Sequence, residues 1–446
     1  MNNSIRHIET ALQSGARQHI SNLFTSEHPA DIAAALQKLP PQAAWRALGY
    51  ASISRRADIF SYLVHDYQSL LATVIPRAAL AAVVMEMKAD DRADLYQKLS
   101  EDQRETLMPA LAQAEREDIR QLTSYSEGTA GSVMTSEYAA LPRDISATAA
   151  LTLLRQEAPD AETINRAYIV DENRKLLGTV RLQDIITAPH GANISDIMDT
   201  NTHAIRVSDD EVAAARRIAH YDMIALPVID DQDHLVGIIT HDDALDVLEA
   251  EATDDFHRVA TITNLDTSVA TASVPTLYRA RISWLMLLVF GNIFSGAGIA
   301  HFEDTIAANL ALMFFLPILI ASGGNAGAQS ATLMIRALAT GDIAVSDWGK
   351  IFGRELGVAI LLGLSMAAAI AVIGVFRGGK EIALVIALSM ILIVIVGSLI
   401  GMLLPFLLSR FDMDPATAST PLVTSIADAT GVLIYFSIAN AILAMP

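Results

Sequence analysis

One acidic residue lies inside an otherwise uncharged stretch at the end of the chain. The 32 residues from Pro415 onward carry a single charge, Asp428, within the segment 425–431. A charge at the centre of a bilayer costs about 3 kcal/mol on insertion scales, so such a residue usually faces a cavity and has a function. No Lys or Arg lies at a comparable depth, which favours a cation pathway. A buried structural acceptor for a Ser or Thr hydroxyl is the alternative.

A second group of polar and small residues interrupts the apolar run 305–335. Its members are Pro317, Gly323, Gly324, Asn325, Gly327 and Gln329. The proline frees a carbonyl, and small residues allow membrane helices to approach closely. Asn325 and Gln329 are four residues apart and therefore face the same way on a helix. The pattern predicts a pore lining; helix packing with amide bonds between helices is the alternative, and the two are compatible.

A dense acidic run precedes the apolar part of the chain. Residues 242–255 hold seven carboxylates and no Lys or Arg. Like charges three or four residues apart repel on a helix, so a run without basic partners is expected to meet cations. Oxygen ligands without His or Cys favour Mg²⁺ or Ca²⁺ over zinc or copper. A solvated acidic linker is the alternative, but the run joins a soluble domain to the first apolar helix.

The C-terminal 172 residues predict a helical membrane domain. Five runs of 19 to 32 residues with at most one charge are long enough to cross a bilayer. These runs are 282–300, 305–335, 356–376, 382–409 and 415–446. Six basic residues flank one side and two the other, which places the N-terminal part in the cytoplasm and the C-terminus outside. We expect no signal peptide, because residues 1–15 are polar.

Composition excludes several functional classes. The chain has no cysteine, which rules out a disulfide scaffold, thiolate metal sites and a Cys nucleophile. Its net charge of −19 argues against a nucleic-acid partner. Residues 1–130 read as short helices separated by prolines, which predicts an all-α superhelical stack. An acidic cluster there, Asp90, Asp91 and Asp94, reads most simply as a solvated helix start.

Residues 131–250 contain an internal repeat. Each copy reads as strand, helix, strand, turn, strand, helix, with matching segments 133–135 and 197–199. The repeat resembles a tandem pair of CBS domains, an α/β regulatory module. That resemblance implies an adenosine nucleotide or a metal ion as ligand. The segment 240–243 is close to the family's Thr/Ser-x-x-Asp ribose contact, whereas 180–184 departs from it.

The whole chain resembles the MgtE family of magnesium channels and transporters. The most specific segments are 323–332, 335–340 and, around Asp428, the stretch from Pro421 to Tyr435. The resemblance implies a homodimer with one pore on its two-fold axis and Asp428 as the selectivity residue, with Asn325 beside the ion. It also implies regulatory metal ligands, which are Asp90, Asp91, Asp94, Asp243, Asp246, Glu251, Asp254 and Asp255. Pro317, Gly323, Gly324, Gly327, Gln329 and Pro421 would line or shape the pore.

The expected protein is therefore a multidomain membrane protein of a bacterial-type inner membrane. Its predicted parts are a helical N-terminal domain (1–130), a tandem CBS pair (131–252), an amphipathic connecting or plug helix (253–275) and a five-helix channel domain (276–446). The predicted function is uptake of Mg²⁺ down its electrochemical gradient, gated by cytosolic Mg²⁺. Because Mg²⁺ loses its water reluctantly, two carboxylates would hold a hydrated ion.

Other functions compete with this one. A transporter of Mn²⁺ or Co²⁺, or a cation–proton exchanger, would use the same domains. A membrane-anchored nucleotide sensor would need neither Asp428 nor the segment 323–330. An enzyme is not expected, because the sequence shows no pairing of a nucleophile with a base.

Overall fold

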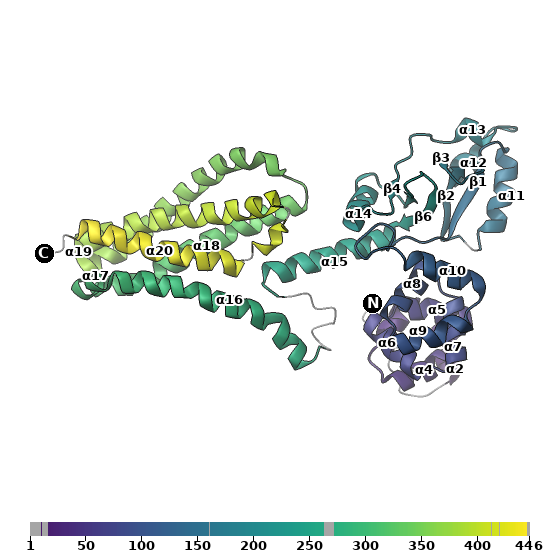
Figure 1. Ribbon diagram of the computed structural model, residues 1–446, viewed down its shortest axis with the longest axis horizontal. Coiled ribbons are helices and arrows are strands. Elements are labelled where there is room, and N and C mark those ends of the chain that lie inside the picture. The colour runs from purple at the N-terminus through teal and green to yellow at the C-terminus, as the bar shows by residue number, and fades with distance from the viewer. Residues whose placement is uncertain are drawn as a thin grey trace. The chain divides into compact units, whose positions relative to one another are not determined.

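The computed structural model describes residues 10, 17–159, 161–262, 272–411, 413–418 and 420–443. They form two compact units, Met1–Ala250 and Glu251–Pro446 (Figure 1). The boundary falls inside helix α15 (His241–Val259), which contributes its first half to one unit and its second half to the other.

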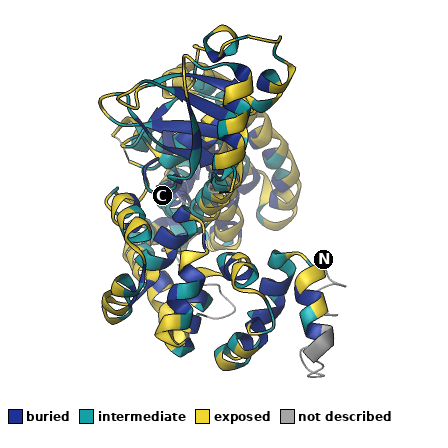
Figure 2. Ribbon diagram, turned by 90° about the vertical axis from the view of Figure 1, so that its right-hand side faces the viewer, coloured by how far each residue is buried: buried dark blue, intermediate teal, exposed yellow. Residues whose placement is uncertain are grey.

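The N-terminal part of the first unit is a stack of short helices, as predicted. The helices are α2 (Arg17–Ser26), α3 (Pro29–Leu36), α4 (Pro41–Leu48), α5 (Ile53–Ser61), α6 (His65–Val74), α7 (Arg77–Met85), α8 (Ala89–Lys98), α9 (Glu101–Leu107), the 3₁₀ turn η1 (Met108–Ala110) and α10 (Gln113–Leu122). Pro29 and Pro41 occupy first helical positions, where the missing N–H has no partner to lose. From α3 to α8, each helix packs against the helix two further along the chain. The buried faces form one apolar core (Figure 2).

The predicted repeat folds into two similar α/β units. The first comprises β1 (Tyr138–Pro142), α11 (Ala147–Glu157), β2 (Thr163–Val170), β3 (Leu176–Arg181), α12 (Leu182–Thr187) and α13 (Ile194–Ile197). The second comprises β4 (Ile205–Arg206), α14 (Glu211–His220), β5 (Ala225–Ile229), β6 (Leu235–Thr240) and α15. Each sheet has three strands in chain order, a parallel pair followed by an antiparallel hairpin.

The matching segments 133–135 and 197–199 each lie on the last strand of the other repeat. Thr135 bridges to Ile238 of β6, and Asp199 bridges to Thr179 of β3. A Cβ added to Gly237 would lie 2.8 Å from the Thr135 carbonyl oxygen, and one added to Gly178 would lie 2.7 Å from that of Asp199. Glycine is therefore required on each β-strand because the matching segment lies directly on it.

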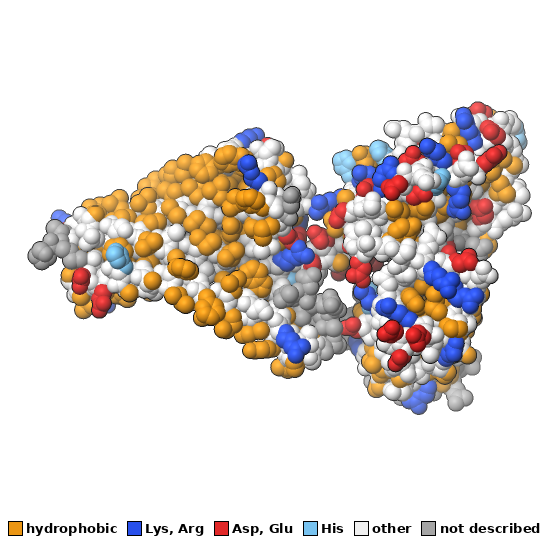
Figure 3. Space-filling view, in the orientation of Figure 1, with side chains coloured by type: hydrophobic (Ala, Val, Ile, Leu, Met, Phe, Trp, Pro, Cys, Tyr) orange, Lys and Arg blue, Asp and Glu red, His pale blue; other side chains and the backbone are white. Residues whose placement is uncertain are grey.

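The second unit is a bundle of apolar helices. They are the second half of α15, α16 (Val274–His301), α17 (Glu303–Ala308), α18 (Ala311–Ala339), η2 (Val345–Asp347), α19 (Trp348–Arg410), η3 (Pro415–Thr417) and α20 (Thr420–Ile442). Hydrophobic side chains cover most of the visible face of this unit, whereas the first unit displays many charged ones (Figure 3). Among the described residues, four helices are long and apolar enough to cross a membrane.

The prediction of five separate membrane helices is not confirmed, because two predicted spans lie in one element. Runs 356–376 and 382–409 both belong to α19, whose 63 residues are interrupted by a non-helical conformation at Gly379 (φ 81°, ψ −177°). Only glycine adopts this conformation readily. Gly363 lies against the backbone of Ile391 and Gly374 against that of Ala383. The two halves of α19 therefore run antiparallel and form a hairpin.

The connecting helix predicted for 253–275 lies partly outside the described residues. Helix α15 ends at Val259, Thr261 has a positive φ of 58°, and residues 263–271 lie outside the described part of the chain. The β-branched residues at 259 and 261–263 favour helix poorly, which is consistent with this end. The next helix, α16, begins at Val274 with a side-chain cap from Ser273.

Candidate ion pathway and acidic junction

Glycines set the distance between α18 and the second half of α19. A Cβ added to Gly397 would lie 2.4 Å from the Gly323 carbonyl oxygen, and one added to Gly401 would lie 2.0 Å from that of Gly327. Both pairs are four residues apart, so two small-residue ridges meet along parallel helices. The structure thus assigns Gly323 and Gly327 to packing. Gly397 and Gly401 were missed, although their spacing in an apolar run was a readable signal.

Asp428 lies on α20 where this helix faces α18. A Cβ added to Gly324 would lie 3.5 Å from Asp428 Oδ1 and 3.3 Å from Thr424 Cγ2. The side chain of Asp428 is partly exposed. Within the described part of the chain, the Asp428 carboxylate has neither a hydrogen-bond donor nor a basic partner. Gly324 therefore leaves room for an unneutralised carboxylate at the α18–α20 contact.

The predicted amides lie on the outer surface of the single chain. Asn325 and Gln329 are exposed on α18, whereas Gly324 and its neighbours Gly323 and Ala326 are buried. An amide pair and a carboxylate on the surface of an apolar bundle cannot face hydrocarbon without a large cost. These side chains must face water, an ion or another polar surface.

The two predicted prolines lie within helices rather than ending them. Pro317 is inside α18, which continues from Ala311 to Ala339. Pro421 is the second residue of α20, where a missing N–H leaves no bond unmade. Its carbonyl accepts a hydrogen bond from Thr424 Oγ1 at 2.9 Å. Pro421 therefore shapes the start of the helix that carries Asp428.

In the first unit, acidic residues of two domains come together. Asp90 and Asp91 occupy the first turn of α8, and Asp243 the first turn of α15. Asp243 accepts a hydrogen bond from Thr240 Oγ1 at 2.5 Å. Asp90 Oδ1 is fully buried and has no hydrogen-bond partner among the described residues. We call the group of Asp90, Asp91 and Asp243 the acidic junction.

Mutual repulsion and burial perturb these carboxyl groups. Burial, and then the charge of Asp90, raise the pKa of Asp243 to about 8. The same two causes raise the pKa of Asp91 to about 7. Burial also raises the pKa of Asp90 itself, and the charge of Asp242 adds to the shift. The junction therefore favours a positive ion or protons over three bare carboxylates.

Asp94 and Asp246 lie further along the same two helices. Burial, and then the charge of Asp90, raise the pKa of Asp94 to about 6, and the pKa of Asp246 on α15 is raised by burial and then by Glu249. Glu251, Asp254 and Asp255 belong to the second unit. Among the described residues, no group of three or more His, Asp or Glu side chains is arranged to hold a metal ion. A hydrated Mg²⁺ needs only one or two carboxylates, so such a cage is not required for it.

Two basic residues beside the junction tie the helical stack to the CBS pair. Lys88 forms an ion pair with Glu162, and the buried Arg92 contacts Glu137 at 3.0 Å and Asp118 at 3.8 Å. Burial raises the pKa of Glu137 to about 7 although Arg92 opposes the shift. These ion pairs were not predicted. The only feature of the sequence that pointed to them was the pair of basic residues flanking Asp90 and Asp91.

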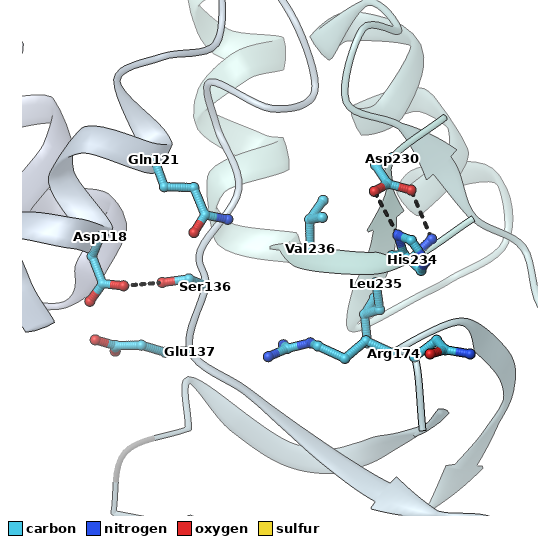
Figure 4. Close-up of a pocket in the computed structure, with 10 residues that line it drawn as sticks. Asp118, Gln121, Ser136, Glu137, Arg174, Asp230, His234, Leu235 and Val236 are labelled. Carbon is cyan, nitrogen blue, oxygen red and sulfur yellow. Dashed lines mark hydrogen bonds and ion pairs between the residues drawn. The ribbon is translucent and has the colours of Figure 1, made fainter. Parts of the chain in front are cut away.

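A polar cavity of about 620 Å³ lies where α10 faces the hairpin turns of both CBS repeats (Figure 4). Asp118 and Gln121 come from α10, and Arg174 and His234 from the two turns. His234 Nδ1 lies 2.9 Å from Asp230 Oδ2. Both acidic and basic groups line the cavity, so its charge does not single out one class of ligand.

A smaller cavity of about 240 Å³ lies in the first CBS repeat, lined by Arg166, Thr179, Arg181, Asp184, Ile197 and Asp199. Arg181 donates two hydrogen bonds to the Asp184 carboxylate, at 2.7 and 2.8 Å. In the second repeat Thr240 takes the place of this arginine and bonds Asp243. The departure from the Thr/Ser-x-x-Asp pattern in the first repeat is therefore a replacement of a hydroxyl by a guanidinium.

The CBS fold and the apolar helices define the class: a multi-pass membrane protein with a CBS pair. Family models agree over most of the chain: "MgtE intracellular N domain" matches residues 27–128, "CBS domain" matches 130–191 and 194–250, and "Divalent cation transporter" matches 316–438. The magnesium transporter MgtE of Thermus thermophilus is 36% identical over 98% of both chains. That of Bacillus subtilis is 30% identical over 98% of this chain and 97% of its own. The chain belongs to the MgtE family.

Solved structures agree with this assignment for the soluble part. The soluble part of a magnesium transporter superposes with a TM-score of 0.52 and 29% identity, covering 56% of this chain and 99% of its own. The cytosolic domain of the Mg²⁺ channel MgtE in complex with ATP superposes with a TM-score of 0.52 and 32% identity, covering 55% and 99%.

Proposed function

We propose that this protein carries Mg²⁺ into the cytoplasm down its electrochemical gradient and that cytosolic Mg²⁺ closes the pathway. The observation that carries this proposal is the unneutralised Asp428 carboxylate at the α18–α20 contact, in a family whose named relatives are magnesium transporters. A membrane potential contributes about 2.3 kcal/mol per charge per 100 mV, which is sufficient to drive uptake of a divalent ion. No catalytic reaction is proposed.

The pathway is proposed to lie between two copies of the chain. Asp428, Asn325 and Gln329 are at least partly exposed on one bundle, so a two-fold partner would bury them around a shared polar path. The soluble unit supports the same symmetry, because Ile186 and Leu245 occupy matching positions of the two CBS repeats and are 62% and 61% exposed. Two carboxylates cannot replace six waters, so the ion would pass hydrated.

The two halves of α19 are proposed to cross the membrane separately. Sixty-three helical residues would extend about 95 Å, roughly three times the hydrocarbon thickness, so a single crossing is excluded. With the hairpin at Gly379 on the outer side, five crossings place the soluble unit in the cytoplasm and the C-terminus outside. The distribution of Lys and Arg supports this orientation in an inner membrane.

The regulatory ions are proposed to bind at carboxylates that repel one another without them. In the first unit these are Asp90, Asp91 and Asp243, with Asp94 and Asp246 nearby in sequence. In the second unit they are Glu251, Asp254 and Asp255. Mg²⁺ at the acidic junction would supply the charge that the orphaned Asp90 Oδ1 lacks. An ion can contact acids of both α8 and α15 only when the helical stack and the CBS pair are packed together. Binding of the ion therefore shifts the equilibrium toward this packed state.

An adenosine nucleotide is proposed as a further ligand of the CBS pair. The solved structure of the related cytosolic domain is a complex with ATP. The Arg181–Asp184 cavity offers a guanidinium for phosphate and a carboxylate for ribose hydroxyls, the chemistry that such a ligand requires.

The direct test is uptake into liposomes that contain the purified protein. With an inside-negative potential, we expect Mg²⁺ influx well above that of protein-free vesicles, reduced when millimolar Mg²⁺ is present at the cytoplasmic face. Parallel assays with Mn²⁺ and Co²⁺ test the alternative cargo. If Mn²⁺ or Co²⁺ enters as fast as Mg²⁺ or faster at the same concentration, Mg²⁺ is not the selected substrate. If none of the three metals enters, the protein is not a transporter of these ions.

The acidic junction predicts a pH-dependent stability in metal-free buffer. Because the folded-state pKa values of Asp243 and Asp91 are raised, their contribution is fully present below about pH 4 and is lost as pH rises to about 8. We expect the thermal midpoint in EDTA to fall between pH 6 and 8. Asp243→Asn should raise that midpoint at pH 8 by about 2–4 °C, the shift that ~1 kcal/mol produces in a unit of this size.

The same measurement in Mg²⁺ instead of EDTA is the matched comparison. Mg²⁺ should remove most of the pH dependence of the wild-type thermal midpoint, and it should raise the midpoint of Asp243→Asn less than that of the wild type. Asp231→Asn, at a carboxylate whose side chain is 90% exposed, should leave both behaviours unchanged. A wild-type midpoint that rises with pH would contradict the junction as a site of repulsion.

A further inference from the structure

The last turns of α15 carry an arginine that contacts two carboxylates at once. The Arg258 guanidinium lies 3.0 Å from Asp254 Oδ2, one turn earlier on the same helix. It also forms an ion pair with Asp414, in the segment between α19 and α20. All three residues belong to the second unit. The guanidinium is suited to this role, because its planar fork can bond two acids in different directions.

Asp414 is linked to the helix that carries the candidate pore residue. Its Oδ1 accepts the backbone N–H of Ala416 at 2.8 Å and thereby caps η3, which precedes α20. Next to Arg258, Val259 packs against an apolar cluster that includes Ile335 of α18 and Val423 of α20. Val423 lies five residues before Asp428. The end of α15 is thus held at the start of α20 by charge and by apolar contact.

We propose that Arg258 is a positioning residue that fastens the end of the connecting helix to the start of α20 without a bound metal. This inference rests on the proposed function. The acids flanking the contact, Asp254 and Asp414, are also groups that a divalent cation would bridge. At low Mg²⁺, the positive charge of Arg258 then takes the place of a metal ion and keeps the end of α15 at the start of α20. It thereby lowers the Mg²⁺ concentration that is needed to close the pathway.

The first test measures the contact itself. The chain contains no cysteine, so Val259→Cys introduces a single thiol at the packed position. In metal-free buffer, we expect its maleimide labelling to be about three- to fivefold faster with Arg258→Gln than with Arg258 present, since partly exposed ion pairs contribute only modestly to stability. Arg258→Lys should restore part of the protection, and 1 M salt should imitate Arg258→Gln.

A double-mutant cycle tests the pairing. Asp414→Asn keeps an oxygen for the η3 cap but loses the charge, so Arg258→Gln combined with Asp414→Asn should label no faster than Arg258→Gln alone. Arg410→Gln removes an exposed positive charge at the end of α19 and should not change the rate. Equal labelling with and without Arg258, or fully additive effects of the two substitutions, would overturn the proposal.

The second test measures regulation in the intact channel. In the liposome assay, Arg258→Gln should raise by about two- to fivefold the Mg²⁺ concentration at which flux is half closed, with the maximal flux and the metal preference unchanged. An unchanged midpoint would overturn the role of Arg258 in gating. If the wild type carries no Mg²⁺, the proposed function fails, whereas the labelling assay still reports whether Arg258 holds α15 in place.

Discussion

Replacing Asp428 by Ala or Asn is expected to reduce Mg²⁺ flux by about 100-fold or more. A unit charge about 5 Å from an ion at an effective dielectric constant of 20 contributes roughly 3 kcal/mol per ionic charge, and every 1.4 kcal/mol is a factor of ten in binding. The carboxylate is at the α18–α20 contact without a basic partner among the described residues, so its negative charge is not neutralised and is available to the ion. Liposome flux at fixed membrane potential measures the effect.

The paired substitutions separate charge from shape. Asp428→Asn has nearly the same volume, so it should fold with an unchanged or higher thermal midpoint, because an unpaired and partly buried charge is removed. Asp428→Glu keeps the charge on a longer side chain and should retain partial flux with an altered preference among Mg²⁺, Mn²⁺ and Co²⁺. Wild-type flux and selectivity in Asp428→Asn would show that the ion does not pass this carboxylate.

Gly397→Ala is expected to be among the most damaging small substitutions in the membrane unit. The added Cβ would lie 2.4 Å from the Gly323 carbonyl oxygen, so α18 and α19 must separate. Overpacking of this kind typically costs about 1–3 kcal/mol. Gly324, next to Gly323, faces Asp428, so the displacement should also disturb the pathway. We expect a lower thermal midpoint in detergent and a loss of most flux.

Gly357→Ala is the matched control on the same helix. A Cβ at Gly357 meets no atom within 4 Å, and Ala is favoured over Gly in a helix by about 0.5–1 kcal/mol. This variant should therefore be neutral or slightly stabilised, with unchanged flux. If both variants lowered the midpoint equally, close glycine packing would not explain the sensitivity of Gly397.

Periodicity and composition were sufficient for the elements of this fold. Alternating helix, strand and turn signals in 131–250 predicted the order of both CBS repeats, because hydrophobic spacing and turn residues act locally. The matching segments around Thr135 and Asp199 were visible as a repeat. Their function was not visible, since each segment covers a glycine of a distant strand, and sequence spacing carries no record of that contact.

The α19 hairpin shows a different limit. The apolar runs on either side of Gly379 were each long enough to predict a crossing. Charge counting could not show that Gly379 reverses the chain while the flanking residues remain helical, because this depends on one backbone conformation that glycine alone adopts readily. The close approach of Gly397 to Gly323 was similarly hidden, as it involves residues 74 positions apart.

The sequence alone determined the domain order, the membrane character of the C-terminal part and the identity of Asp428 as the exceptional charge. These follow from local chemistry: the length of apolar runs, the cost of a charge in lipid and the period of each element. Only the tertiary structure decided which charges meet. It brought Asp90 to Asp243 and Arg258 to Asp414, and it left Asp428 beside Gly324, because electrostatic energy depends on distances that folding sets and spacing along the chain does not.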